Sequence, residues 1–292
     1  MTGPGIGLRA PEVLESMQAQ NPPARRRRGP NVARVVSWIV LILALLYFFV
    51  PLVATLEFSL RAKPYGAAYS NTLKDPAFFS SLLYSFVIGL ITIVVSTLII
   101  VPTAYWVRLR LPRLRPIVEF VTLMPFVIPP VILVFGLIRS YSGAPFHLTE
   151  TKTGGDILLI AGYTVLSFPY MYRAVDSGLR SIDVKALTEA GQSLGSGPFR
   201  VLWSVIFPNL RVALLSGAFL TLAIVIGEFT IALYLARPAF GPYLQHLGQN
   251  ASYEPAAVSL ISFFLTWLAM GVIAFLGRSP QGGGRVQVGG GH

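Results

Sequence analysis

The stretch TEAGQSLGSGPF, at residues 188–199, combines a carboxylate, an amide, two serine hydroxyls and three glycines. Glycine-rich loops bind phosphate when their backbone N–H groups surround the anion, but that chemistry uses the pattern G-x-x-x-x-G-K-[ST] after a strand. This stretch has neither the lysine nor a preceding strand, and no such pattern occurs elsewhere in the sequence. We therefore predict that the chain binds no nucleotide cofactor and that any ATP hydrolysis belongs to a separate chain.

Glu228 is a second candidate, because it lies in the apolar run IVIGEFTIALYL. An ionisable side chain inside a membrane span is costly and is a functional hypothesis by default. One interpretation is that Glu228 faces a translocation path and attracts a cationic solute, with Tyr84 and Ser85 on the same path. The other, which we favour, is that Glu228 forms hydrogen bonds within the helix bundle and holds a bend near Gly227.

Catalytic and metal-binding constellations are not evident in the sequence. Its histidines, His147, His246 and His292, have no partners at metal-ligand spacing. The chain has no cysteine, and no histidine lies in an apolar run where it would act as the base of a nucleophile-base-acid group. We predict a protein that is not an enzyme and holds no metal.

The composition indicates a membrane protein. Of the 292 residues, 54% are hydrophobic and only 12% are charged, whereas soluble domains carry about 25% charged residues. The 23 lysines and arginines exceed the 12 acidic residues, a formal charge of +11. Such an excess is typical of either a nucleic-acid partner or cytoplasmic membrane loops.

Six apolar runs are long enough to cross a bilayer as helices, since a span needs about 20 mainly apolar residues. We therefore expect an all-α integral membrane protein. Prolines 51, 102, 125, 129 and 130 predict bent helices. The six runs are residues 35–56, 81–107, 116–138, 157–175, 205–235 and 256–276.

The distribution of basic residues predicts the orientation. If the N-terminus is cytoplasmic, 17 of the 23 lysines and arginines fall on the cytoplasmic side and 6 on the other, as the positive-inside rule requires. Both termini are then cytoplasmic, and so is the loop that contains residues 188–199. The basic excess follows from this topology, so we expect no nucleic-acid partner.

The domain organisation follows from these runs. We expect a disordered basic tail at residues 1–34, a transmembrane domain at 35–277 and a flexible, glycine-rich tail at 278–292. Within the transmembrane domain, residues 183–204 form a polar loop. Asp183 is a plausible N-cap for a short helix over 184–194, and Gly195 is able to end that helix with positive φ. The small residues Ala190 and Gly191 would let another surface approach this helix closely.

This loop resembles the EAA loop of binding-protein-dependent ABC importer permeases, whose pattern is E-A-A, three residues, G, nine residues, I-x-L-P. Gly191, Val205 and Phe207 depart conservatively from the pattern. The similarity extends to LLYSF, PTAYW, LMPFVIPPVIL and GEF in the flanking runs. The matching residues in the loop are Glu189, Ala190, Gly191, Gly195, Val205, Ile206, Phe207 and Pro208.

The resemblance implies a type I importer permease bundle of six transmembrane helices in a bacterial inner membrane. The loop would form a cytoplasmic coupling helix between helices 4 and 5 that docks into an ABC ATPase dimer, which binds the ATP. Its coupling residues would be Glu189, Ala190, Gly191, Gly195 and Pro208. The other implied partners are a second permease subunit, homologous or identical, an extracytoplasmic solute-binding protein and membrane lipid.

The solute is less specified. GEFTIALYL and ASYEPAAVSLISFFLTWL are most similar to spermidine and putrescine permeases, which implies a polyamine. Iron, sulfate or molybdate, phosphonate and sugar permeases share much of the pattern and remain alternatives. An ion-coupled secondary transporter is a further alternative, but it is expected to have internal repeats or several intramembrane ionisable groups.

Overall fold

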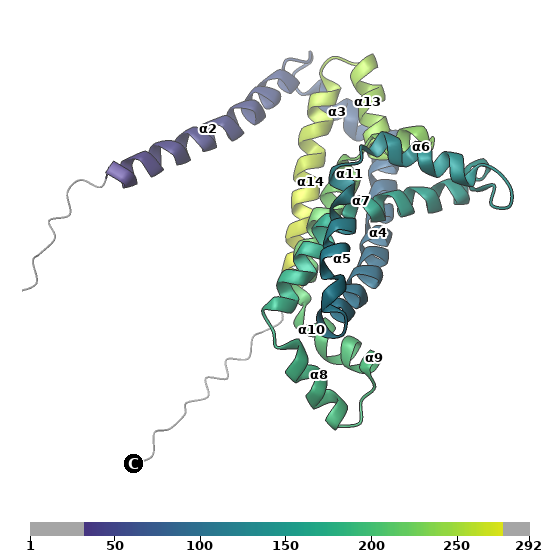
Figure 1. The fold of residues 1–292 in the computed structure, drawn as a ribbon. Coiled ribbons are helices and arrows are strands. Elements are labelled where there is room, and N and C mark those ends of the chain that lie inside the picture. The colour runs from purple at the N-terminus through teal and green to yellow at the C-terminus, as the bar shows by residue number, and fades with distance from the viewer. Residues whose placement is uncertain (1–31, 277–292) are drawn as a thin grey trace, which may run out of the picture. The chain divides into compact units, whose positions relative to one another are not determined.

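The computed structural model describes residues 32–276 as helices joined by short connectors, with no strand among them (Figure 1). The predicted tails at 1–34 and 278–292 lie almost wholly outside the described residues; residues 32–34 belong to the first helix. The chain divides into two units, residues 1–53 and residues 54–292, and we describe each by itself.

The first unit contributes most of α2, which spans Val32–Leu60 and crosses the unit boundary. The helix extends the predicted run 35–56 at both ends and continues through Pro51. Its stretch Arg34–Leu60 is long and apolar enough to cross a membrane.

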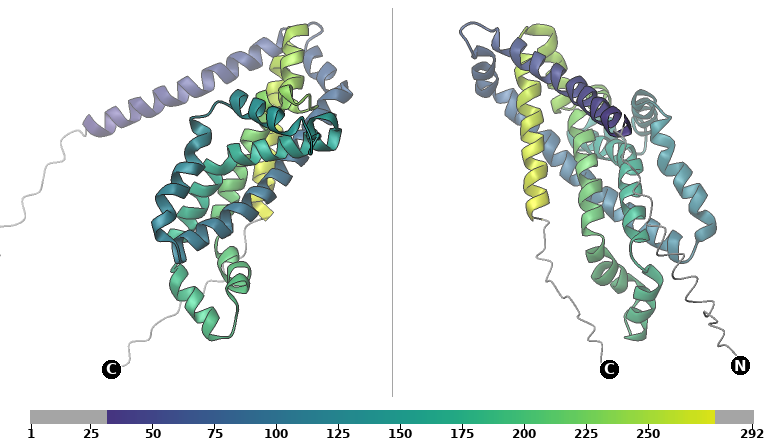
Figure 2. Two further views of the ribbon diagram at one scale, coloured as in Figure 1. Left: turned by 45° about the vertical axis from the view of Figure 1, so that its right-hand side comes forward. Right: turned by 90° about the vertical axis from the view of Figure 1, so that its left-hand side faces the viewer.

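The second unit is built around three helices that lie side by side (Figure 2). They are α4 (Pro76–Leu109), α7 (Lys152–Arg180) and α11 (Arg211–Gly227). Glycines allow the close approach of these helices: a Cβ atom added to Gly89 would lie 2.8 Å from Leu222 Cδ1, and one added to Gly217 would lie 2.7 Å from Met171 Sδ. Small residues at such crossings are the usual means of packing helices in membranes.

The predicted run 116–138 is not one continuous helix. The structure divides it into α5 (Arg115–Leu123), the 3₁₀ turn η2 (Met124–Phe126) and α6 (Pro130–Tyr141), with a bend of 100°. Prolines explain the break: Pro129 and Pro130 have no backbone N–H to donate, and a proline disfavours helical geometry in the residue before it. The expectation of a bent helix at these prolines is confirmed, and the expectation of an unbroken helix is wrong.

The predicted run 205–235 is also broken. The π-helical turn η4 (Leu202–Ile206) and α10 (Phe207–Asn209) precede α11 at a bend of 77°, and α11 itself ends at Gly227. Pro208 lies in α10, half-buried at this bend. A second short helix, α12 (Thr230–Tyr234), follows after Glu228 and Phe229. Glu228 therefore lies at a break in the helix, where sequence analysis placed it inside a continuous span.

The remaining elements connect and cover the three central helices. α3 contacts α14 and α4, and α13 contacts α4, α14 and α12. The end of the second unit that carries α3 and α13 is opposite the end that carries α8 and α9 (Figure 1). The bounds are α3 Ala67–Lys74, η1 Pro112–Leu114, η3 Leu148–Glu150, α8 Val184–Ser193, α9 Pro198–Val201, α13 Phe240–Asn250 and α14 Glu254–Leu276.

Among the described residues, three helices are long and apolar enough to cross a membrane, and five spans result if each bent pair is one span. The helix α7, which contains the predicted run 157–175, is not among them. Many α7 side chains are buried within the bundle, and a helix surrounded by protein needs fewer apolar residues than one surrounded by lipid. The count of six spans stays a prediction.

Candidate functional site

The helix α8 begins as the sequence predicts. The Asp183 carboxylate accepts a hydrogen bond of 3.0 Å from the backbone N–H of Ala186. This bond satisfies one of the N–H groups that the first turn of a helix leaves without a partner. The helix spans Val184–Ser193, one residue shorter than the prediction.

The end of α8 is a Schellman motif centred on Gly195, which has φ of 79°. The Ser196 N–H donates to the Gly191 carbonyl at 3.0 Å, and the Gly195 N–H donates to the Gln192 carbonyl at 2.9 Å. This pair of bonds needs a residue in the left-handed region after the helix, where glycine carries no steric penalty. The predicted role of Gly195 as a helix terminator is confirmed.

A buried contact attaches α8 to the bundle. The Thr188 hydroxyl lies 3.1 Å from the Tyr105 hydroxyl of α4, and both side chains are buried. Val184 packs into the same apolar cluster as Tyr105, Leu179 and Val201. Since this cluster joins α4, α7, α8 and α9, a force applied to α8 is transmitted to the ends of two central helices.

The opposite face of α8 is exposed. Leu194 is 87% exposed and Phe199 is 64% exposed. Glu189 and Ala190 are exposed as well, and Glu189 lies 3.8 Å from Lys185 in a surface ion pair. Two large apolar side chains beside a carboxylate, on a protruding loop, are typical of a protein contact.

Gly191 has a different surrounding from the one that sequence analysis expected. A Cβ atom added there would lie 2.7 Å from Val201 Cγ2 of α9. The close approach that this glycine permits is therefore made within the chain, between α8 and α9. Sequence spacing identified the small residue but not the surface that packs against it.

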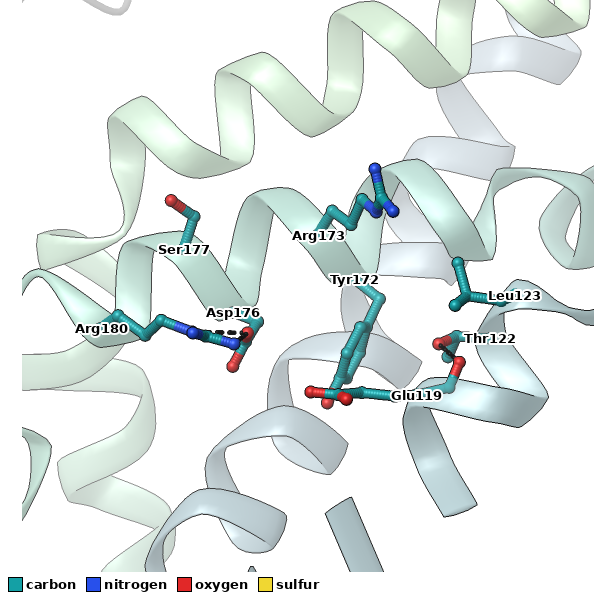
Figure 3. Close-up of a pocket in the computed structure, with 8 residues that line it drawn as sticks. All are labelled: Glu119, Thr122, Leu123, Tyr172, Arg173, Asp176, Ser177 and Arg180. Atoms are coloured by element: carbon teal, nitrogen blue, oxygen red, sulfur yellow. Dashed lines mark hydrogen bonds and ion pairs between the residues drawn. The ribbon is translucent and has the colours of Figure 1, made fainter. Parts of the chain in front are cut away.

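A cluster of charged side chains lies where α4, α5 and α7 meet (Figure 3). Asp176, whose side chain is 16% exposed, lies 2.7 Å from Arg180, 3.3 Å from Arg115 and 4.0 Å from Arg108. Arg115 also binds Glu119 at 2.8 Å. Sequence analysis did not single out Asp176, because its partners on α4 and α5 are more than sixty residues away along the chain.

Glu228 caps the short helix α12. Its Oε1 accepts from the Thr230 N–H at 2.7 Å, and its Oε2 accepts from the Ile231 N–H at 2.9 Å. The side chain is 9% exposed and lies on a cavity of about 400 Å³ lined also by Phe126, Tyr170 and Gly227. Both carboxylate oxygens therefore bind backbone N–H groups, as the interpretation of Glu228 as a bundle hydrogen-bonding residue expects.

Tyr84 and Ser85 do not line the cavity that contains Glu228. The Tyr84 hydroxyl donates to the Asp156 carboxylate, and the Ser85 hydroxyl accepts from the Phe240 N–H at 2.8 Å. Asp156 also lies 2.9 Å from Nε of Arg237, an ion pair without hydrogen-bond alignment. Asp156 and Arg237, which sequence analysis missed, connect α7 to the segment after α12.

We expect replacement of Glu228 by alanine to lower the free energy of unfolding by about 1–2 kcal/mol, because the cap of α12 is lost. The unfolding midpoint of the detergent-purified protein measures this effect. The matched control is Glu150→Ala, which removes an exposed carboxylate beside His147. An unchanged midpoint for Glu228→Ala would contradict the capping role.

A model of one protein family covers more than half of this chain. The family described as "Binding-protein-dependent transport system inner membrane component" matches residues 100–279. The match includes the end of α4, both bent helices, α7 and the whole α8 loop.

Individual relatives are more distant. The ferric transport system permease protein of Actinobacillus pleuropneumoniae is 27% identical over 163 residues, which are 55% of this chain but only 22% of that protein. The "Probable molybdenum ABC transporter permease protein" of Haloferax volcanii is 26% identical over 73% of this chain and 80% of its own length. The molybdenum transport system permease protein of Escherichia coli is 31% identical over 39% of this chain and 53% of its own.

The fold is similar to that of a solved transporter chain. A crystal structure of a bacterial ABC transporter involved in the import of the acidic polysaccharide alginate aligns with a TM-score of 0.61 and 19% sequence identity. The alignment covers 85% of this chain and 97% of that one. The two chains share the arrangement of their helices.

Proposed function

The chain belongs to the family of binding-protein-dependent transport system inner membrane components, and we propose that it is the permease subunit of an ATP-driven ABC importer. In this role it forms part of the path for a small solute through a bacterial inner membrane and catalyses no reaction itself. Its N- and C-termini are cytoplasmic in the topology that the basic residues favour.

The observation that carries the proposal is the α8 loop. The loop protrudes from one end of the second unit (Figure 1), exposes Leu194 and Phe199, and is attached to α4 through Thr188 and Tyr105. Such a loop suits contact with an ATPase pair, which would bind and hydrolyse the ATP in separate chains. Glu189 and Gly195 act in different ways: Glu189 supplies charge at the contact, and Gly195 sets the direction of the chain after α8.

The transport cycle follows from the attachment of α8. We infer that closing the ATPase pair on ATP moves the α8 loops of two permease subunits and that Tyr105 and the surrounding apolar cluster transmit this movement to α4 and α7. The second subunit is a homologue or another copy of this chain. An extracytoplasmic binding protein delivers the solute to the opposite end of the bundle.

For the solute, we favour an inorganic ion over a polyamine. The relatives reported above carry the words ferric and molybdenum in their names. Glu228, the carboxylate that would attract a polyamine, spends both oxygens on backbone N–H groups. A polyamine remains the second candidate, on the resemblance of GEFTIALYL to spermidine and putrescine permeases.

Copurification with an ATPase tests the proposed function. We expect the tagged chain, coexpressed with the candidate ATPases of its source, to retain one of them through purification. The double variant Leu194→Glu, Phe199→Glu should retain at most about one tenth as much, because two apolar contact residues become charged.

The matched control is Tyr65→Glu, which places a charge at a residue that is 81% exposed in the connector between α2 and α3. This variant should retain the ATPase fully. The proposal fails if the unaltered chain retains no ATPase, or if the double variant retains as much as the unaltered chain.

A further inference from the structure

A cavity of about 420 Å³ lies between α5 and α7, on the side of the α8 end of the unit (Figure 3). Its volume is within the range of small-molecule sites. The lining is polar and includes Glu119, Tyr172, Arg173, Asp176, Ser177 and Arg180. None of these residues is part of the α8 loop or of the Glu228 cavity.

The carboxylates of this region already have cationic partners. Asp176 is surrounded by Arg108, Arg115 and Arg180, and Glu119 pairs with Arg115. Arg173 takes part in none of these pairs. With Arg173 included, four guanidinium groups stand against two carboxylates, so the cavity has a net positive charge.

Arg173 and Ser177 project together from one side of α7, whereas Tyr172 and Asp176 point to the other side (Figure 3). The two residues are four positions apart, which places them on the same helix face. Both are exposed, and neither has a hydrogen-bond or ion-pair partner within residues 32–276. One guanidinium and one hydroxyl are thus free to bind a molecule in the cavity.

The position of Arg173 along the helix matters. It lies seven residues before the end of α7 at Arg180, which is about 10 Å along the axis. A charged side chain at such depth faces the protein interior or a water-filled cavity, because exposure to lipid is costly. We therefore take the side of α7 that carries Arg173 to face water.

The two cavities are neighbours along the same seam. Tyr170 and Phe126 line the cavity of Glu228, and Arg173 and Leu123 line the cavity of Arg173. Each cavity thus uses residues of α7 and of the α5–η2 segment that are three apart in sequence. A molecule that leaves the first cavity along α7 arrives at Arg173 after about one helical turn.

We propose that Arg173, assisted by Ser177, binds the transported solute as it leaves through this seam, and that the solute is an oxyanion such as sulfate or molybdate. This inference rests on the proposed importer function and narrows its solute to an anion. A guanidinium suits this task because its planar N–H groups match two oxygens of an oxyanion at once.

Uptake into proteoliposomes tests the inference. The importer, reconstituted with its ATPase and binding protein, is given radiolabelled sulfate or molybdate with ATP inside the ATPase-accessible space. We expect Arg173→Gln to lower the maximal uptake rate about tenfold, the usual consequence of losing one hydrogen bond to a charged group. Arg173→Lys should retain an intermediate rate. The binding-protein concentration for half-maximal uptake should stay unchanged.

Arg139→Gln is the matched control, because Arg139 is an exposed arginine at the end of α6 and lines neither cavity. It should transport as the unaltered importer does. The inference is overturned if Arg173→Gln transports normally, or if the importer moves spermidine but neither anion. If the unaltered chain assembles with no ATPase, the proposed function itself fails.

An anionic lipid headgroup offers the same oxyanion chemistry as a free solute, and a second arm separates the two. Uptake is measured in vesicles of phosphatidylcholine alone and in vesicles that also contain phosphatidylglycerol. A solute site predicts the same loss for Arg173→Gln in both. A loss confined to the phosphatidylglycerol vesicles would assign Arg173 to lipid and overturn the inference.

Discussion

Replacing Gly241 by alanine is expected to destabilise the protein by about 1–3 kcal/mol, the usual cost of overpacking. A Cβ atom at this position would lie 2.4 Å from the Glu228 carbonyl oxygen and 2.9 Å from Phe229 Cα. These are backbone atoms, so no side-chain rotation relieves the contact. Either α13 or the Glu228 break has to move.

Movement of α13 is restricted at its start. The Phe240 N–H donates to the buried Ser85 hydroxyl, and the Tyr243 hydroxyl donates to Asp75 Oδ2 at 2.7 Å. Burial raises the pKa of the Tyr243 phenol and the bond to Asp75 raises it further, so this tyrosine keeps its proton. The strain from Gly241→Ala should therefore displace the Glu228 segment, and the cavity beside it, more than α13.

Gly248→Ala is the matched control, because Gly248 lies in the same helix and a Cβ atom there would meet no atom within 4 Å. Alanine is a better helix former than glycine by up to about 1 kcal/mol, so this variant should be neutral or more stable. Thermal unfolding in detergent measures both variants. Equal midpoints for the two would show that the contact at Gly241 is not restrictive.

Replacing Asp176 by alanine is expected to cost about 3 kcal/mol, near the lower limit for breaking a buried ion pair, since the side chain is 16% exposed. The substitution leaves Arg108, Arg115 and Arg180 close together without the carboxylate that neutralises them. Repulsion among these side chains should separate the ends of α4, α5 and α7. Thermal unfolding of the purified protein measures the loss of stability.

Two further variants locate the cause of this effect. Glu57→Ala removes a carboxylate from the pair with Arg61, in which both side chains are about 60% exposed, and it should have little effect because exposed pairs contribute little. Adding Arg115→Gln to Asp176→Ala should restore part of the stability. A loss that is the same for Asp176→Ala and Glu57→Ala would refute the electrostatic account.

Local patterns in the sequence predicted local structure well. Asp183, the helix after it and Gly195 were all correctly identified, because an N-cap and a left-handed terminator act within one or two turns of the same segment. The membrane class followed from composition alone. The prolines at 129 and 130 correctly indicated a bend, although its 100° angle depends on how the two halves pack.

Contacts between distant segments were not predictable in this way. Asp176 and Arg108 are 68 residues apart, Asp156 and Arg237 are 81 apart, and neither pair has a signal in its own neighbourhood. Gly191 was recognised as a position of close approach, but the surface that approaches it is Val201 of the same chain. Glu228 was recognised as unusual, but the helix break that makes it a cap was not.

The sequence by itself thus determined that this chain is a helical membrane protein, where its apolar runs lie and how the α8 loop begins and ends, because hydropathy and capping are properties of contiguous residues. Only the tertiary structure decided which charges are paired and which are free. Asp176 and Arg173 lie on one helix three residues apart, yet one is surrounded by three arginines and the other has no partner among the described residues. That difference arises from the packing of α4 and α5 against one side of α7, which no local pattern records.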